Sequence, residues 1–78
     1  MIAVASTLQR QGLGSKLLQA VEGSVRAVNG RLLLIETSDK TSFERTRRFY
    51  QKHGYVEVAR IPDYFTDGDG KVSFIKRL

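Results

Sequence analysis

The chain has 78 residues, enough for one domain or part of one, and its 41% hydrophobic and 27% charged residues are the balance of a folded globular protein. It has no cysteine, which excludes disulfides and cysteine nucleophiles and fits a cytoplasmic protein, and with its single histidine we expect no metal site. The apolar run at residues 32–35 is far too short to cross a bilayer, so we expect no membrane partner. The net charge of +5 predicts an anionic partner but does not distinguish a phosphate-bearing cofactor from nucleic acid.

The first half of the chain predicts a strand, a helix and a second strand. Residues 1–5 are the apolar end of a strand, and a polar turn with two glycines follows at 6–15. Apolar residues recur at helical spacing through 13–28, which predicts an amphipathic helix of about four turns that ends at Asn29-Gly30, with the glycine in a left-handed cap. The segment 31–37, with its continuous apolar run at 32–35, predicts a strand buried on both faces.

The second half predicts a helix followed by a hairpin. Thr41 and Glu44 fit a capping box, so we expect the helix to occupy 41–54. Alternation at 55–61 predicts a strand, and an Asp-Gly-Asp-Gly turn leads into a last strand at 71–78. The order β-α-β-α-β-β predicts a single α/β domain. We expect parallel pairing across each helix and an antiparallel hairpin, hence a mixed sheet.

The glycine turn between the first strand and the first helix predicts an anion site. The first N–H groups of a helix have no intrahelical partner, and the helix dipole is positive at that end. Gly12 and Gly14 allow the backbone to approach a phosphate, and Arg10 and Lys16 add positive charge. The turn is not a Walker loop, because the lysine does not directly follow the second glycine. It is not a dinucleotide fingerprint either, because Leu17 stands where a third glycine is needed.

The pattern that does fit is Gln-x-x-Gly-x-Gly at 9–14, which in this setting resembles the pyrophosphate loop of the GNAT superfamily of acyl-CoA N-acyltransferases. A second segment, Phe-Tyr-Gln-Lys-His-Gly-Tyr at 49–55, is similar to the segment that ends the second cofactor-side helix of that family. With both motifs in order around one buried strand, the chain is identified as a member of this superfamily, with a truncated GNAT-like α+β fold. The resemblance covers 1–78, but only the C-terminal, cofactor-binding half of the family fold.

The resemblance implies transfer of an acetyl group from acetyl-CoA to a primary amine by direct attack in a ternary complex, without a metal. It implies that Tyr50 acts as a general acid, returning a proton to the departing thiolate. Glu36, at the end of the buried strand, is the carboxylate that we nominate as general base. The implied cofactor-binding residues comprise a strand that pairs with the pantetheine arm and the loop that holds the pyrophosphate: Ile2, Ala3, Val4, Gln9, Arg10, Gln11, Gly12, Leu13, Gly14 and Ser15.

Other interpretations of these residues stay open. The glycines also suit the geometry of the turn alone, Tyr50 also suits a core position, and His53 suits a helix C-terminus, where it complements the dipole. The alternative function is a non-catalytic module that binds coenzyme A or another nucleotide without turnover. Nucleic-acid binding rests on the net charge alone, without the aromatic platform that such modules use, so we expect no nucleic-acid partner.

The resemblance also bears on partners. Tyr64 and Phe65 would border the acceptor site by family analogy, and they suggest a small amine or an amino acid as the acceptor. The strand at 1–5 and the buried strand would expose unpaired backbone groups and apolar side chains. We therefore expect a homodimer, or a partner chain that supplies the missing strands, or a fragment of a longer reading frame.

Overall fold

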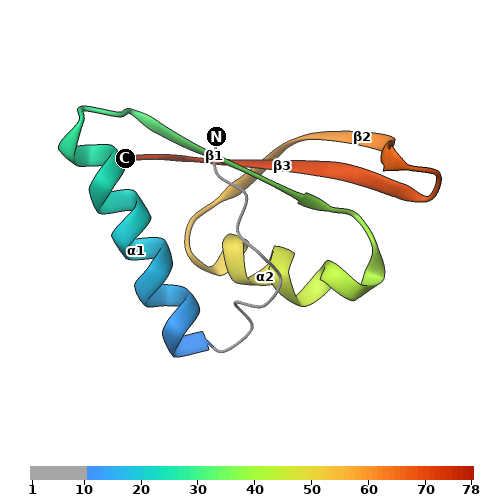
Figure 1. The fold of residues 1–78 in the computed structure, drawn as a ribbon, viewed down its shortest axis with the longest axis horizontal. Coiled ribbons are helices and arrows are strands. Elements are labelled where there is room, and N and C mark those ends of the chain that lie inside the picture. The colour runs from blue at the N-terminus through green and yellow to red at the C-terminus, as the bar shows by residue number, and fades with distance from the viewer. Residues whose placement is uncertain (1–10) are drawn as a thin grey trace.

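The computed structural model describes residues 11–78 (Figure 1). The predicted strand at 1–5 and the cofactor-binding calls on Ile2, Ala3, Val4, Gln9 and Arg10 lie outside the described residues. The described elements are, in chain order, α1 (Gln11–Ala27), β1 (Leu32–Ser38), the 3-10 turn η1 (Thr41–Phe43), α2 (Glu44–Lys52), β2 (Val56–Thr66) and β3 (Asp69–Arg77).

The three described strands form one sheet in the order β1-β3-β2, and both pairings are antiparallel. The predicted parallel pairing of the two strands on either side of α2 is therefore wrong, because β3 lies between β1 and β2. The side chains explain this order. Val72 and Phe74 make β3 the most buried strand, so it takes the centre, whereas every residue of β2 is exposed and β2 lies at an edge. The α+β class itself is confirmed.

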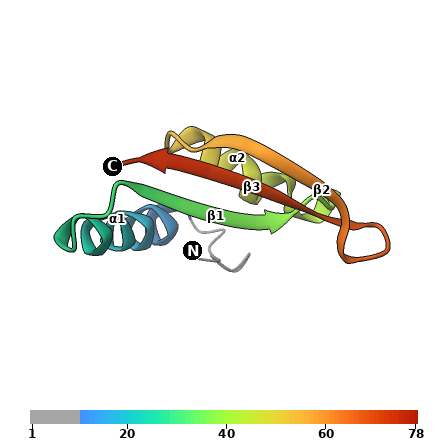
Figure 2. The same ribbon diagram turned by 90° about the horizontal axis from the view of Figure 1, so that it is seen from above.

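Both helices lie on the same face of the sheet, as Figures 1 and 2 show from two directions. The core forms where they meet it. Ile35 of β1 and Phe74 of β3 are paired at the centre of the sheet, and both are fully buried. Burial of each such side chain contributes about 2 kcal/mol to the free energy of unfolding. The other core residues come from both helices, from β1 and β3, and from the residue before β2: Leu18, Leu33, Tyr50, Tyr55 and Val72.

The burial of β1 differs from the prediction. Its buried residues alternate, and Leu33 and Ile35 face the helices, whereas Leu32 on the other face is 50% exposed. The expectation of a strand buried on both faces is met only in part, because on the second face Leu34 and Glu36 are half-buried and Ser38 is buried, whereas Leu32 is exposed. A run of four apolar residues does not distinguish a strand covered on both faces from one whose second face is open.

The ends of the helices also depart from the sequence prediction. Helix α1 begins at Gln11, so part of the predicted glycine turn is its first helical turn. At its other end Asn29, not Gly30, has the left-handed conformation, with φ 61°. The predicted capping box is absent at α2, since neither η1 nor α2 has a side-chain cap. Glu44 instead pairs with Arg48, with 2.6 Å between Oε1 and Nη2.

The predicted hairpin is confirmed. Thr66 pairs with Asp69 across a two-residue loop in which Gly68 has a φ of +78°. Strand β2 is longer than predicted, because it continues past an irregular stretch in which Asp63 has a φ of 56°. The carboxylate of Asp63 accepts a hydrogen bond of 2.7 Å from the N–H of Gly68, which ties this irregular stretch to the turn.

Candidate functional site

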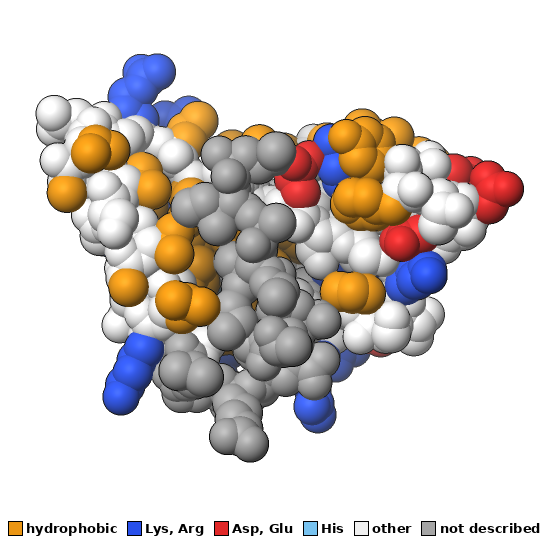
Figure 3. All heavy atoms as spheres, in the orientation of Figure 1, with side chains coloured by type: hydrophobic (Ala, Val, Ile, Leu, Met, Phe, Trp, Pro, Cys, Tyr) orange, Lys and Arg blue, Asp and Glu red, His pale blue; other side chains and the backbone are white. Residues whose placement is uncertain are grey.

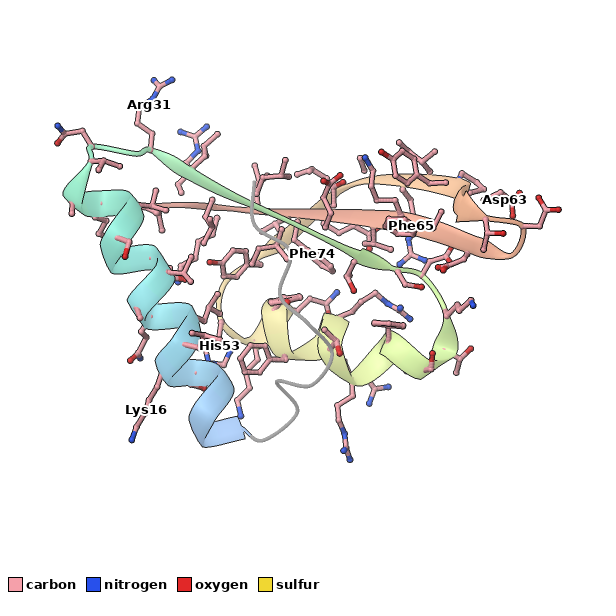
Figure 4. The ribbon with its side chains drawn as sticks, viewed as in Figure 1. Lys16, Arg31, His53, Asp63, Phe65 and Phe74 are labelled. Carbon is pink, nitrogen blue, oxygen red and sulfur yellow. The ribbon has the colours of Figure 1, made fainter. Side chains whose placement is uncertain are left out.

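The two sequence motifs meet where the first turn of α1 approaches the end of α2. Gly14 is buried there, and no acidic residue occupies the first turn of α1. Ser15 Oγ lies 2.9 Å from Nε2 of His53, the residue that follows α2. Figure 4 shows His53 between the two helices. The structure thus joins residues that are 38 positions apart in the sequence: Ser15 directly follows the glycine motif at 9–14, and His53 belongs to the motif at 49–55.

Tyr50 lies in α2 and is completely buried. Its ring centre lies 5.9 Å from those of both Tyr55 and Phe74, in the core beneath the sheet. Burial raises the pKa of Tyr50 to about 12, since the phenolate would lose its hydration. The phenol is therefore protonated at every physiological pH, as a proton donor must be. It is also packed as a core residue is, so the structure is consistent with both interpretations of Tyr50.

Glu36 is held in an ion pair. Its Oε2 lies 2.6 Å from Nζ of Lys71 on the neighbouring strand, and both side chains are 15% exposed. Lys71 Nζ also lies 4.1 Å from the ring centre of Tyr64. The hydrogen bond to Glu36 and the charge of that carboxylate outweigh the opposing effect of burial and raise the pKa of Lys71.

The two predicted catalytic residues do not come together in the described chain. Ile35 and Phe74 are paired and face the helices, in the same core as Tyr50. Successive residues of a strand point to opposite faces of the sheet, so Glu36 points to the face that α1 and α2 do not cover. Tyr50 and Glu36 therefore lie on opposite sides of the sheet.

Sequence reasoning missed a buried polar cluster between α1 and the sheet. Glu22 is 5% exposed, and its Oε2 accepts hydrogen bonds of 2.7 Å from the Tyr55 hydroxyl and 3.1 Å from Lys76 Nζ. Burial acts to raise the pKa of Glu22, but these hydrogen bonds and the charge of Lys76 hold it below its ordinary value. Burial and the bond to Glu22 raise the pKa of Tyr55. The signal in the sequence was one carboxylate on the apolar face of the helix, four residues after Leu18.

Residues 11–78 contain neither a cluster of metal-binding side chains nor a helix that could span a membrane. No three side chains of the kinds that bind metals gather closely enough there to hold an ion. Neither α1 nor α2 is long and apolar enough to span a membrane.

The comparisons with known proteins agree with this arrangement. Residues 1–57 match the family model of the acetyltransferase (GNAT) domain. Because that match covers well over half of its length, the chain belongs to the GNAT acetyltransferase family. The comparison with curated proteins gave no match.

Several solved structures have the same fold. A protein assigned to the GNAT acetyltransferase family from Desulfovibrio desulfuricans is 38% identical, with a TM-score of 0.82 over 95% of this chain and 47% of that one. Ard1 from Thermoplasma volcanium is 28% identical, with a TM-score of 0.79 over 100% of this chain and 51% of that one. An aminoglycoside 6′-N-acetyltransferase complexed with coenzyme A is 20% identical, with a TM-score of 0.75 over 95% and 54%. The chain spans about half the length of each of these proteins.

Proposed function

We propose that the 78-residue chain is the cofactor-binding, C-terminal half of a GNAT N-acetyltransferase, which transfers the acetyl group of acetyl-CoA to a primary amine by direct attack in a ternary complex. The observation that carries the proposal is the contact between Ser15, which directly follows the glycine motif, and His53 of the second motif. The match of residues 1–57 to the GNAT domain supports it. A related fold has been solved in complex with coenzyme A, which supports the same cofactor here.

The start of α1 has the properties that a pyrophosphate requires. The first N–H groups of a helix are free to bind phosphate oxygens, and the helix dipole favours an anion at that end. The buried Gly14 carries no side chain that would hold a phosphate away, and no carboxylate in the first turn repels it. We therefore assign the pyrophosphate of coenzyme A to residues 9–15. When bound, acetyl-CoA supplies the thioester that the amine attacks.

Tyr50 is the proposed proton donor to the thiolate that leaves when the carbon–sulfur bond breaks. A thiol has an ordinary pKa of about 8.5, so complete transfer from a phenol of pKa about 12 is unfavourable by about 5 kcal/mol. In its buried environment Tyr50 therefore stabilises the leaving sulfur mainly as a hydrogen-bond donor. It becomes an effective acid only if ligand binding lowers its pKa.

Glu36 remains the proposed general base, and the geometry sets a condition on that role. The ammonium group of Lys71 covers its carboxylate at 2.6 Å, so the ion pair has to open before Glu36 can accept a proton from an amine. The position of Glu36 on the face opposite to Tyr50 requires the acceptor to approach from that face. Tyr64 and Phe65, 54% and 51% exposed, are the proposed border of the acceptor site.

The same observations favour the second candidate, a module that binds coenzyme A without turnover. Tyr50 is fully buried, Glu36 is neutralised by an ion pair, and the two lie on opposite faces of the sheet. Acetyl transfer by the purified chain separates the two functions, since both predict coenzyme A binding and only the first predicts turnover.

A partner that completes the sheet is part of the proposal. The face of the sheet away from the helices exposes Leu32, Val56 and Ile61 by 44% or more. Figure 3 shows hydrophobic side chains gathered near the hairpin end of the molecule as well. Because the chain spans about half of the matched structures, we propose that a second copy or another polypeptide covers this face.

The direct test is calorimetric titration of the chain with coenzyme A, comparing Gly14→Asp with Gly23→Asp. Both substitutions add one negative charge to α1. Gly23 is exposed and has open space around it, so its variant controls for net charge and helix propensity. We expect micromolar binding by the wild type, a loss of at least tenfold in Gly14→Asp, and almost no loss in Gly23→Asp. Equal losses in the two variants, or no binding by a folded wild-type chain, would reject the assignment of the site.

A further inference from the structure

The hydrogen bonds of His53 fix where its protons are. Nδ1 lies 2.9 Å from the carbonyl oxygen of Phe49, and Nε2 lies 2.9 Å from Ser15 Oγ. A carbonyl oxygen only accepts, so Nδ1 carries a proton. In the neutral ring Nε2 is then an acceptor, and the Ser15 hydroxyl donates its only hydrogen to His53.

This bond has a consequence for an anion at the start of α1. Phosphate oxygens accept hydrogen bonds, and a hydroxyl group that already donates elsewhere presents only its lone pairs to them. When His53 gains a proton, Nε2 becomes a donor and Ser15 Oγ, which lies 2.9 Å away, becomes its acceptor. The Ser15 hydrogen is then free to point at a phosphate oxygen. One proton on His53 thus turns the Ser15 side chain from a poor phosphate ligand into a good one.

We propose that the Ser15 side chain is a phosphate ligand in its own right, beyond the backbone of its loop, and that His53 is the positioning residue that sets the direction of its hydrogen bond. Binding of coenzyme A is then coupled to uptake of a proton by His53. The inference rests on the proposed function, because it takes the pyrophosphate of coenzyme A as the anion at the start of α1.

The charged groups around His53 favour this coupling. On its own segment Lys52 is exposed, and from α1 come the exposed Lys16 and the buried Glu22. Figure 4 shows Lys16 extending away from His53. From β3, Lys76 lies against Gly54, next to His53, but it is already bonded to Glu22.

Among the described residues, protonated His53 therefore has two hydrogen-bond acceptors, the Phe49 carbonyl oxygen and Ser15 Oγ. The nearby carboxylate of Glu22 is already bonded to Lys76. A bound phosphate would supply the missing negative charge. Since an opposite charge nearby favours the protonated ring, the anion and the proton stabilise each other. Linkage requires the effect to be equal in both directions, so a lower pH must strengthen binding by as much as binding favours protonation.

The experiment follows the C2–H proton resonance of the imidazole during pH titrations of the 78-residue chain, with and without coenzyme A. The assignment is unambiguous, since the chain contains one histidine. We expect coenzyme A to move the midpoint of the His53 titration upward by about half to one pH unit, and the affinity to rise about three- to tenfold between pH 8 and pH 6. Calorimetry at pH 7 in two buffers of different ionisation enthalpy should show proton uptake. Dephospho-coenzyme A should give the same shift, which assigns the effect to the pyrophosphate.

Variants separate this role from a structural one. Ser15→Ala should bind more weakly at low pH and lose most of the pH dependence, and Ser15→Thr, which keeps the hydroxyl, should restore it. Lys16→Met should lower the affinity at all pH values while leaving the coupling intact. Circular dichroism establishes that each variant is folded.

Two results would overturn this inference and leave the proposed function standing: coenzyme A that binds without moving the His53 titration, or a Ser15→Ala chain that keeps the full pH dependence. A folded wild-type chain that binds no coenzyme A would overturn the proposed function with it.

Discussion

The buried cluster of Glu22, Tyr55 and Lys76 makes a quantitative prediction for Tyr55→Phe. This substitution removes one oxygen and leaves the ring, which is 2% exposed, in place. It deletes a hydrogen bond of 2.7 Å to a buried carboxylate and leaves Glu22 bonded to Lys76 alone. Hydrogen bonds to charged groups contribute about 1.5–3 kcal/mol, so the free energy of unfolding at pH 7 should fall by about 2 kcal/mol. In a domain of this size the melting temperature should fall by about 8–16 °C.

The stabilisation by the hydrogen bond between Tyr55 and Glu22 should decrease both at low and at high pH. The pKa of Glu22 is lowered in the folded state, so the stabilisation is present above the ordinary pKa of a carboxyl group and is lost as the pH falls through the folded value. The pKa of Tyr55 is raised, so the stabilisation is complete below the ordinary pKa of a phenol, about 10, and is lost as the pH rises further. The difference between wild type and Tyr55→Phe should therefore be largest near neutral pH and shrink at both extremes.

The assay is urea unfolding followed by circular dichroism at several pH values. Tyr64→Phe is the matched control, because it removes the same oxygen from a ring that is 54% exposed, and it should change the free energy of unfolding by less than about 0.5 kcal/mol. Equal stability of Tyr55→Phe and wild type at pH 7, or a difference that does not depend on pH, would refute the reasoning about this cluster.

Three more predictions follow from particular positions. Gly70→Ala should lower the free energy of unfolding by about 2–3 kcal/mol in urea titrations, because a Cβ there would collide with the carboxylate of Asp39 and lie 2.9 Å from the carbonyl oxygen of Ile61. Gly23→Ala should raise it by about 0.5–1 kcal/mol, since the helix gains propensity and the added methyl group meets open space; a loss would show that the site is not open. Tyr50→Phe should reduce turnover at least tenfold and leave coenzyme A affinity within twofold, by calorimetry. An unchanged rate would remove Tyr50 from the mechanism, and no turnover by the wild type favours the binding module.

Features set by local sequence were predictable. The apolar periodicity of α1 and the glycine turn of the hairpin place these elements correctly, because each depends on residues within a few positions of one another. The two motifs also identified the family to which residues 1–57 match. The capping box failed although its pattern was present: Glu44 pairs with Arg48 instead, and Arg47 donates to the carbonyl oxygens of Ser38 and Lys40 in the preceding loop.

Features that depend on contacts between residues far apart in the sequence were not predictable. The sequence of β3 alone does not predict its position between β1 and β2. The order of the strands depends on which of them buries the most apolar surface. The Ser15–His53 contact spans 38 positions and the Glu22–Lys76 contact 54 positions. The first contact depends on how the two helices pack against each other, and the second on how α1 packs against the sheet. The positions of Tyr50 and Glu36 on opposite faces followed from the register of β1 against β3 in the same way.

The central position of β3 has a consequence for how the protein is made. During synthesis β1 and β2 leave the ribosome before the strand that joins them, so neither has its described sheet partner until β3 follows. Until β3 pairs with β1, the apolar side chains of β1 stay exposed on the nascent chain. Exposed apolar surface of this kind aggregates readily. Sheet formation therefore completes late and through contacts distant in sequence, which slows folding. Truncations that remove β3 should consequently abolish the sheet as a whole, rather than shorten it by one strand.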